Sequence, residues 1–202
     1  MSGLKVVKGI VACLALAGCS SSWTVAYDDV TASKSPSNWH VHNVVVTVPG
    51  TLTQSDVNSF APDADIVWHG ELNGDRRTQV ARIVRDGIFQ GTRDLNGPRG
   101  VEIAVTLRHF HAVTPRAVSR APGAVHNISY DIQVFDDITG EPITEQESIS
   151  ADLEAMVGHA AVVSAIEGRT QKVRIINHLE RVTEGWLGIG PDVRGEFSGF
   201  GR

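Results

Sequence analysis

The N-terminal segment limits where this chain can fold and which cross-links it can use. Lys5 and Lys8 precede an apolar run over residues 9–16, and the small pair Ala17–Gly18 follows it. A basic start, an apolar stretch of about 7–15 residues and small residues before a cleavage point are typical of a secretory signal. The run is too short for a membrane-spanning helix, which needs about 20 apolar residues. We therefore expect the chain to be exported and residues 1–18 to be removed.

A cysteine stands where an ordinary signal would end in its cleavage site. The stretch Leu16-Ala17-Gly18-Cys19 resembles the lipobox of bacterial lipoproteins. The resemblance implies that Cys19 carries the lipid and becomes the first residue of the mature chain, and two or more acyl chains make a stable membrane anchor. The alternatives are a plain signal peptide with an incidental cysteine and a buried apolar N-terminal segment. Ser20 replaces the Asp that favours inner-membrane retention in that family, so the resemblance implies an outer-membrane protein facing the periplasm.

Lipidation would leave the domain without a thiol, because Cys13 departs with the signal and Cys19 is the one other cysteine. We therefore expect neither disulfides nor thiolate chemistry, and a chain of this length can bury a core without cross-links. The net charge of the chain is −5. A mildly acidic domain argues against nucleic-acid binding, which requires a basic face.

Composition divides the chain into four parts. We expect a lipoprotein signal peptide over residues 1–18 and a flexible tether, rich in Ser, Thr and Asp, over residues 19–38. A single domain should occupy residues 39–187, and a Gly-rich tail should follow over residues 188–202.

Runs of β-branched and alternating apolar residues predict the strands of this domain. Turn residues such as Pro and Gly separate the runs. Residues 52–60 give no clear prediction, and residues 114–123 are expected to form a loop because they contain two prolines. The predicted strands cover residues 39–48, 64–68, 101–113, 125–135 and 143–153.

Apolar residues three and four apart predict two amphipathic helices. The first begins after Asp75, a favourable N-cap residue, and runs to about Leu95, and the second covers residues 170–186. Gly87 and Gly91 lie near the apolar stripe of the first helix, where they would let a neighbouring element come close. Residues 158–168 fit either a linker or the start of a helix.

This order of elements predicts an α+β fold. The last three strands are joined by short links, so they should be antiparallel neighbours. The helix between the second and third strands allows one parallel crossover. We therefore predict a two-layer sandwich with a mostly antiparallel five-stranded sheet and two amphipathic helices on one face.

Histidines are the most suggestive polar residues of the strands. His40 and His42 are two residues apart, as are His109 and His111, and this spacing places both rings of a pair on one face of a strand. If the following hairpin folds symmetrically, His109, His111 and His126 offer three nitrogens to zinc or copper. The competing interpretation, which we favour, is that amphipathic rings lie at half-exposed strand ends.

Acidic pairs give little support to catalysis. Asp63 and Asp65 are candidates for acid–base chemistry, as are Asp136 and Asp137, but both pairs stand at turns where Asp accepts local backbone hydrogen bonds. The sequence has no nucleophile elbow, zinc-protease motif, P-loop or dinucleotide fingerprint. We therefore predict no catalytic residues and no cofactor.

Three separated stretches resemble an uncharacterised family of small alphaproteobacterial lipoproteins. They are residues 61–68 (Ala-Pro-Asp-Ala-Asp-Ile-Val-Trp), 74–76 (Gly-Asp-Arg) and 170–176 (Thr-Gln-Lys-Val-Arg-Ile-Ile). This resemblance implies a fold and a location but no activity. More loosely, the order of strands and helices is similar to that of auxiliary lipoproteins of envelope transport and assembly systems.

Two functional hypotheses follow, and an unfamiliar hydrolase ranks below both. The first is a non-enzymatic envelope protein that binds a protein partner or supports an assembly, for instance through an exposed strand edge. The alternative is a periplasmic metal or small-ligand binder that uses the strand histidines. Neither hypothesis involves nucleic acid, and both attach the protein to the membrane through the lipid on Cys19.

Overall fold

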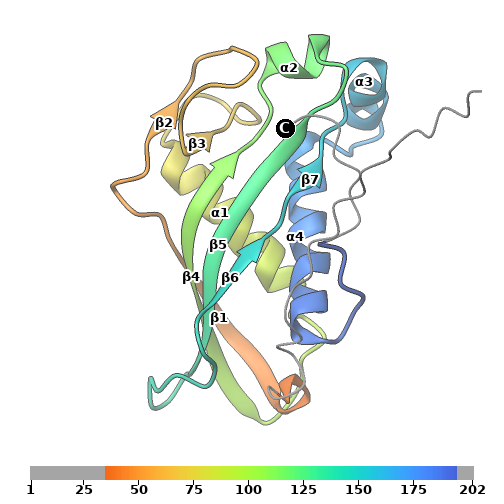
Figure 1. Cartoon of the computed structure of the whole chain (residues 1–202). Coiled ribbons are helices and arrows are strands. Elements are labelled where there is room, and N and C mark those ends of the chain that lie inside the picture. The colour runs from red at the N-terminus through yellow and green to blue at the C-terminus, as the bar shows by residue number, and fades with distance from the viewer. Residues whose placement is uncertain (1–34, 195–202) are drawn as a thin grey trace, which may run out of the picture.

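The computed structural model describes residues 35–194 of the chain, which form one mixed sheet with helices on one face and at one end (Figure 1). The predicted signal peptide and the lipid site at Cys19 lie outside the described residues. A short 3-10 turn over Pro36–Asn38 precedes the first strand. The strands are β1 (Trp39–Thr47), β2 (Gln54–Ser55), β3 (Ile66–Val67), β4 (Arg99–His111), β5 (Val125–Asp136), β6 (Glu147–Ser150) and β7 (Leu153–Glu154). The helices are α1 (Arg76–Gln90), α2 (Pro115–Arg120), α3 (Gly158–Ile166) and α4 (Gln171–Leu187).

The long strand β4 is the centre of the sheet. On one edge it pairs with β5 in antiparallel orientation along most of its length. On the other edge β1 pairs with its first part and β3 with its last two residues, both in parallel orientation. β2 continues the sheet beyond β3, whereas β6 and β7 pair with β5.

The α+β class is confirmed, but the prediction of a mostly antiparallel five-stranded sheet is wrong. The sheet has seven strands, and β1, β2, β3 and β4 run parallel to one another. Three strands precede α1, and two of them, β1 and β3, pair with the same edge of β4 in parallel orientation. The predicted last strand is divided into β6 and β7, because the pairing with β5 is interrupted at residues 151–152.

Both predicted amphipathic helices cover one face of the sheet, as Figure 1 shows for α1 and α4. α1 ends at Gln90 rather than near Leu95, because Gly91 caps it and a turn follows. α2 lies in the segment that we expected to be a loop. Its Pro115 occupies the first turn, where the missing N–H costs nothing, and the Thr114 hydroxyl accepts from the Ala117 N–H at 3.2 Å. Within residues 35–194, no helix has the length and apolar character needed to cross a bilayer.

Close contact between α1 and α4 depends on two glycines, as the sequence indicated. A Cβ atom at Gly87 would lie 2.5 Å from Leu179 Cβ and 3.0 Å from the Ile176 carbonyl oxygen. A Cβ atom at Gly91 would lie 2.5 Å from the carbonyl oxygen of Glu180. All three distances are shorter than van der Waals contact, so each glycine lets the helix backbones approach closely.

Replacing Gly87 by alanine should therefore destabilise the fold. Alanine raises helix propensity by about 1 kcal/mol over glycine, but overpacking a tight contact costs about 1–3 kcal/mol. Because the blocking atoms belong to a helix backbone and a Cβ, we expect a net loss of about 1 kcal/mol or more in urea unfolding. Gly50→Ala is the control, since nothing lies within 4 Å of a Cβ there. Equal stability of Gly87→Ala and the unaltered protein would contradict the packing argument.

Candidate functional site

A cavity of about 320 Å³ lies at the end of the sheet where β4 stops and β5 begins. Its walls come from the loop after β3, from α2 and α3, from β5 and from the start of α4, so distant parts of the chain meet around it. Six of the thirteen lining residues are apolar, and the polar ones include two arginines and two histidines. The lining residues are His69, Val113, Pro115, Val118, His126, Met156, Ala161, Ser164, Ala165, Arg169, Thr170, Gln171 and Arg174.

Local hydrogen bonds hold the helices around this cavity in place. The buried Ser164 hydroxyl in α3 donates to the Arg169 carbonyl oxygen at 2.7 Å, which fixes the turn between α3 and α4. The Gln171 side-chain amide donates to the Val113 carbonyl oxygen at 3.0 Å and joins the start of α4 to the end of β4. The Thr170 hydroxyl caps α4 by accepting from the Val173 N–H.

The cavity is electropositive. No Asp or Glu is among its lining residues, whereas Arg169 and Arg174 are. Thr170 and Gln171 bring the N-terminal end of α4 to the cavity wall, and that end of a helix carries the positive end of its dipole. Glu167 pairs with Arg169, and the Glu154 carbonyl oxygen accepts from Arg174 Nη2 at 2.9 Å, but neither acidic residue lines the cavity.

His126 is the most deeply buried polar residue of the cavity wall, at 1% exposure. Its Nδ1 accepts from the Val113 N–H at 3.3 Å, so in the neutral ring Nε2 carries the proton. Burial lowers the pKa of His126 to about 3, and the positive charges of Arg174 and His178 act in the same direction. The ring is therefore neutral at ordinary pH and presents Nε2–H as a donor.

A second buried histidine lies behind the first. His178 in α4 has its pKa lowered to about 4, first by burial and next by the charge of Arg181. Contact with the Asp152 backbone and carboxylate opposes this shift. The Nε2 atom of His178 is buried without a hydrogen-bond partner among the described residues.

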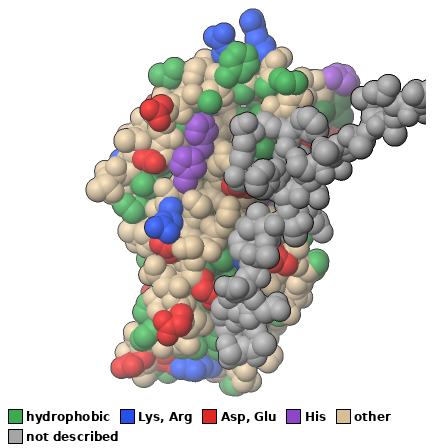
Figure 2. All heavy atoms as spheres, viewed as in Figure 1, with side chains coloured by type: hydrophobic (Ala, Val, Ile, Leu, Met, Phe, Trp, Pro, Cys, Tyr) green, Lys and Arg blue, Asp and Glu red, His purple; other side chains and the backbone are tan. Residues whose placement is uncertain are grey.

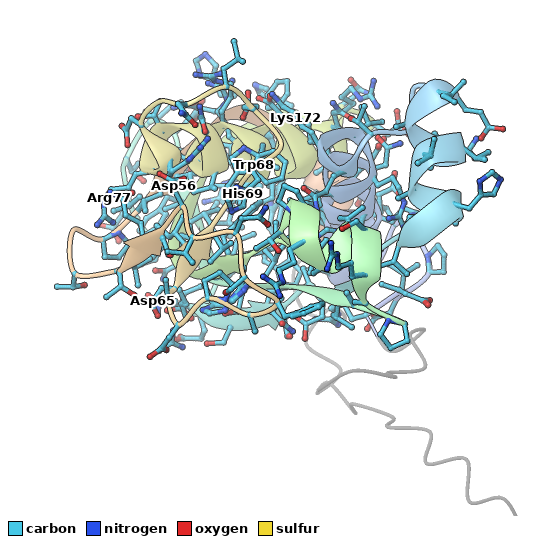
Figure 3. All side chains as sticks on the ribbon, turned by 90° about the horizontal axis from the view of Figure 1, so that it is seen from above. Asp56, Asp65, Trp68, His69, Arg77 and Lys172 are labelled. Atoms are coloured by element: carbon cyan, nitrogen blue, oxygen red, sulfur yellow. The ribbon has the colours of Figure 1, made fainter. Side chains whose placement is uncertain are left out.

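His69 reaches the cavity from the loop after β3, and Figure 3 shows it between α1 and α2 next to Trp68. Its Nε2 is buried without a partner among residues 35–194. Burial lowers the pKa of His69, and the charge of Arg76 lowers it further. The next residues hold the loop in place, because Glu71 accepts from the Trp68 indole at 3.1 Å and from Lys172 Nζ at 2.9 Å.

The start of α1 fixes the same loop from the other side. Asp75 caps the helix by accepting from the Arg77 N–H at 3.1 Å, which confirms the predicted cap. Nothing in the sequence indicated that the next residue, Arg76, is buried, with only 5% of its surface exposed. Its guanidinium donates to Asp56 Oδ1 and Gln79 Oε1, both at 2.8 Å. These contacts make Arg76 a structural residue.

The three histidines considered for a metal site do not converge. His109 and His111 lie side by side with ring centroids 5.7 Å apart. They flank the buried Phe110 in β4, so they lie on the face of the sheet opposite its side chain. Figure 2 shows adjacent histidine side chains on the face that it views. His126 is in phase with the buried Ile128 and Tyr130 of β5, so it points to the same, helix-covered face. Among the described residues, no group of three or more His, Cys, Asp or Glu side chains could hold a metal ion.

The acidic pairs include two residues with local structural roles, as favoured from the sequence. Asp65 accepts from the N–H and hydroxyl of Thr53 at 2.8 and 2.7 Å, and these bonds lower its pKa. Asp136 accepts from the Thr139 N–H at 2.9 Å and from Arg99, which lowers its pKa to about 2. Both carboxylates are therefore stabilised in their charged, hydrogen-bonded form.

Comparison with protein families shows which family this chain belongs to. The model of a family of unknown function, DUF6778, matches residues 39–202, which include every strand and helix described above. The chain belongs to DUF6778. A search of curated proteins found no match.

A solved structure similar to this DUF6778 chain is that of a candidate lipoprotein from Caulobacter crescentus CB15. The two are 10% identical, with a TM-score of 0.34, and the match covers 76% of this chain and 92% of the other. Because DUF6778 has no assigned activity, the function has to be argued from the residues of the cavity and its surroundings.

The buried histidines predict that the DUF6778 domain loses stability in mild acid. Their folded pKa values, about 3 for His126 and about 4 for His178, lie below the usual 6.5, so the unfolded state binds more protons between these limits. Stability should be greatest above pH 6.5. It should fall towards pH 4 by about 1 kcal/mol per pH unit for each histidine.

Urea unfolding between pH 7 and pH 4.5 measures this slope. His178→Leu should reduce the slope of unfolding free energy against pH by about 1 kcal/mol per pH unit, the contribution of one histidine. This holds whatever the effect of the substitution on stability at pH 7. Asn177→Leu, a change of a residue without a titrating group on the exposed side of α4, is the control and should leave the slope unchanged. An identical slope in His178→Leu and the unaltered protein would show that His178 is not the group that titrates.

Proposed function

We propose that this protein is a lipid-anchored envelope protein that binds a protein partner and catalyses no reaction. The lipobox-like stretch Leu16–Cys19 supports the anchor. Ser20, in place of an Asp, supports an outer-membrane position with the domain facing the periplasm. The absence of any recognised catalytic motif from the sequence supports a binding role.

The observation that carries partner binding is the exposed apolar surface of α3. Of the nine residues of this helix, the structure buries Ser164 alone. Val162 is 56% exposed and Ile166 is 81% exposed, and Val163 and Met156 beside them are also exposed. An amphipathic helix of a stable domain normally turns its apolar side to the core, so α3 presents apolar surface that no described element covers.

The position and charge of α3 favour a protein over the membrane as the contact. The described chain begins at Ser35, and Figure 1 places this point at the end of the sheet opposite α2 and α3. α3 (Gly158–Ile166) contains no Lys or Arg, whereas helices that lie on anionic membranes carry basic residues on their polar face. Burying a fully exposed Val or Ile side chain stabilises a contact by about 1.5–3 kcal/mol, so a few such residues suffice for a docking site.

The anchor can be tested with the two cysteines. Cys19→Ser should move the protein from the detergent phase to the aqueous phase in phase partitioning, because the acyl chains are lost. Cys13→Ser is the matched control and should still enter the detergent phase, since Cys13 lies within the signal. Retention of Cys19→Ser in the detergent phase, at the level of the control, would overturn the proposed anchor.

Partner binding can be tested by photo-crosslinking in cells. A photoreactive residue at position 162, in place of Val162, should give a reproducible adduct with one envelope protein. The same protein with the additional substitution Ile166→Glu should give less of this adduct. A photoreactive residue at Ile138 is the control, because Ile138 is 90% exposed but lies in the β5–β6 turn, away from α3. The same adducts from both positions, or none from Val162 under any growth condition, would contradict the proposal.

A further inference from the structure

We propose that the cavity between α2, α3 and the start of α4 binds a small amphiphilic carboxylate, with its carboxylate at the basic end and its apolar body between the helices. This ligand site goes beyond the partner-binding role and does not depend on it. The argument rests on the donors of the cavity, its apolar walls and the groups that surround the two arginines.

The charged end of the cavity suits one carboxylate. Arg174 uses Nη2 for the Glu154 carbonyl oxygen, which leaves other guanidinium donors without a partner among the described residues. Arg169 lies beside it, and Thr170 and Gln171 add the positive end of the α4 dipole. Guanidinium groups and helix N-termini are preferred partners of carboxylates.

Two histidine nitrogens provide independent evidence that a ligand belongs here. His126 lines the cavity at 1% exposure, and because its Nδ1 accepts from the Val113 N–H, its Nε2–H is the donor that the ring offers to a ligand. His69 also lines the cavity, and its Nε2 is buried without a partner. A buried polar atom left unpaired costs about 1–3 kcal/mol, and a hydroxyl or carboxyl group of a ligand would satisfy His69 Nε2.

The apolar walls of the cavity favour a ligand with an aliphatic part. Val113, Pro115, Val118 and Met156 form apolar surface around it, and Ala161 and Ala165 of α3 face it with small side chains. The volume of about 320 Å³ is at the lower end of the range of small-molecule sites. It therefore fits a short aliphatic chain rather than a nucleotide or a long lipid.

The neighbouring charges favour a single negative charge. Glu167 pairs with Arg169, and the charge of Glu154 acts on Arg174, so each arginine is partly neutralised before a ligand arrives. A phosphate dianion would need more compensating charge than this site retains. A metal cation is disfavoured, because the lining contains two guanidinium groups and no carboxylate or thiolate.

Isothermal titration with octanoate tests the site in the full chain carrying Cys19→Ser, so that neither lipid nor detergent competes for the probe. We expect saturable binding of one octanoate. Acetate, which lacks the aliphatic chain, and octan-1-ol, which lacks the carboxylate, should each bind about tenfold more weakly or worse. Arg174→Gln should weaken octanoate binding by about tenfold or more. Arg181→Gln removes the same charge from an exposed position further along α4 and should leave the affinity unchanged.

Ala161→Phe is a second variant that fills the cavity from α3 and should abolish binding, with circular dichroism confirming the fold of both variants. The proposal is overturned if octanoate does not bind, or if octan-1-ol binds as tightly, which would show an apolar site only. It is also overturned if acetate or inorganic phosphate binds as tightly, or if the two arginine variants lose affinity equally. Crosslinking from Val162 is a separate measurement, so failure of the ligand site and failure of partner binding can be told apart.

Discussion

The contact between α1 and α4 determines how the rest of the molecule is arranged. Gly87 and Gly91 let the two helices approach at backbone distance, and this places α4 over the sheet beside α1. The first turn of α4 then reaches the end of β4, where Gln171 bonds to Val113. Arg174 and His178 lie on the same helix, so the position of the basic end of the cavity follows from the helix contact.

The elements with long periodic patterns could be predicted closely from the sequence, and the short ones only in part. The strands β1, β4 and β5 and the helix α4 agree with the predicted ranges within about two residues, because each pattern extends over several repeats. The two-residue strand β3 lies within the predicted strand over residues 64–68. β2 falls in residues 52–60, which gave no clear prediction because two residues are too short to show a period. The parallel pairing of β1 with β4 joins segments that are far apart in the sequence, and no local pattern encodes it.

The candidate site was largely out of reach of sequence reasoning, with one exception. A bulge between Leu107 and His109 shifts the alternation of β4, so His109 and His111 leave the buried face that Val105 and Leu107 occupy. That irregularity has no sequence signal. The position of His126 could have been predicted, because it is in phase with Ile128 and the other apolar residues of β5. Arg174 has no such signal, since an arginine in an amphipathic helix is ordinarily solvated.

The topology of the sheet has a consequence for the order in which the chain folds. Trp39 pairs with Arg99, and among the described strands β1 pairs with β4 alone, so the first strand cannot be completed until the middle of the chain has been synthesised. Contacts between distant segments slow folding, because the intervening loop must close before they form. The hairpin of β4 and β5 is closer in sequence, and it leaves the opposite edge of β4 free for β1 and β3. The N-terminal strand is therefore among the last to dock, and until then the valines of β1 stay exposed to solvent.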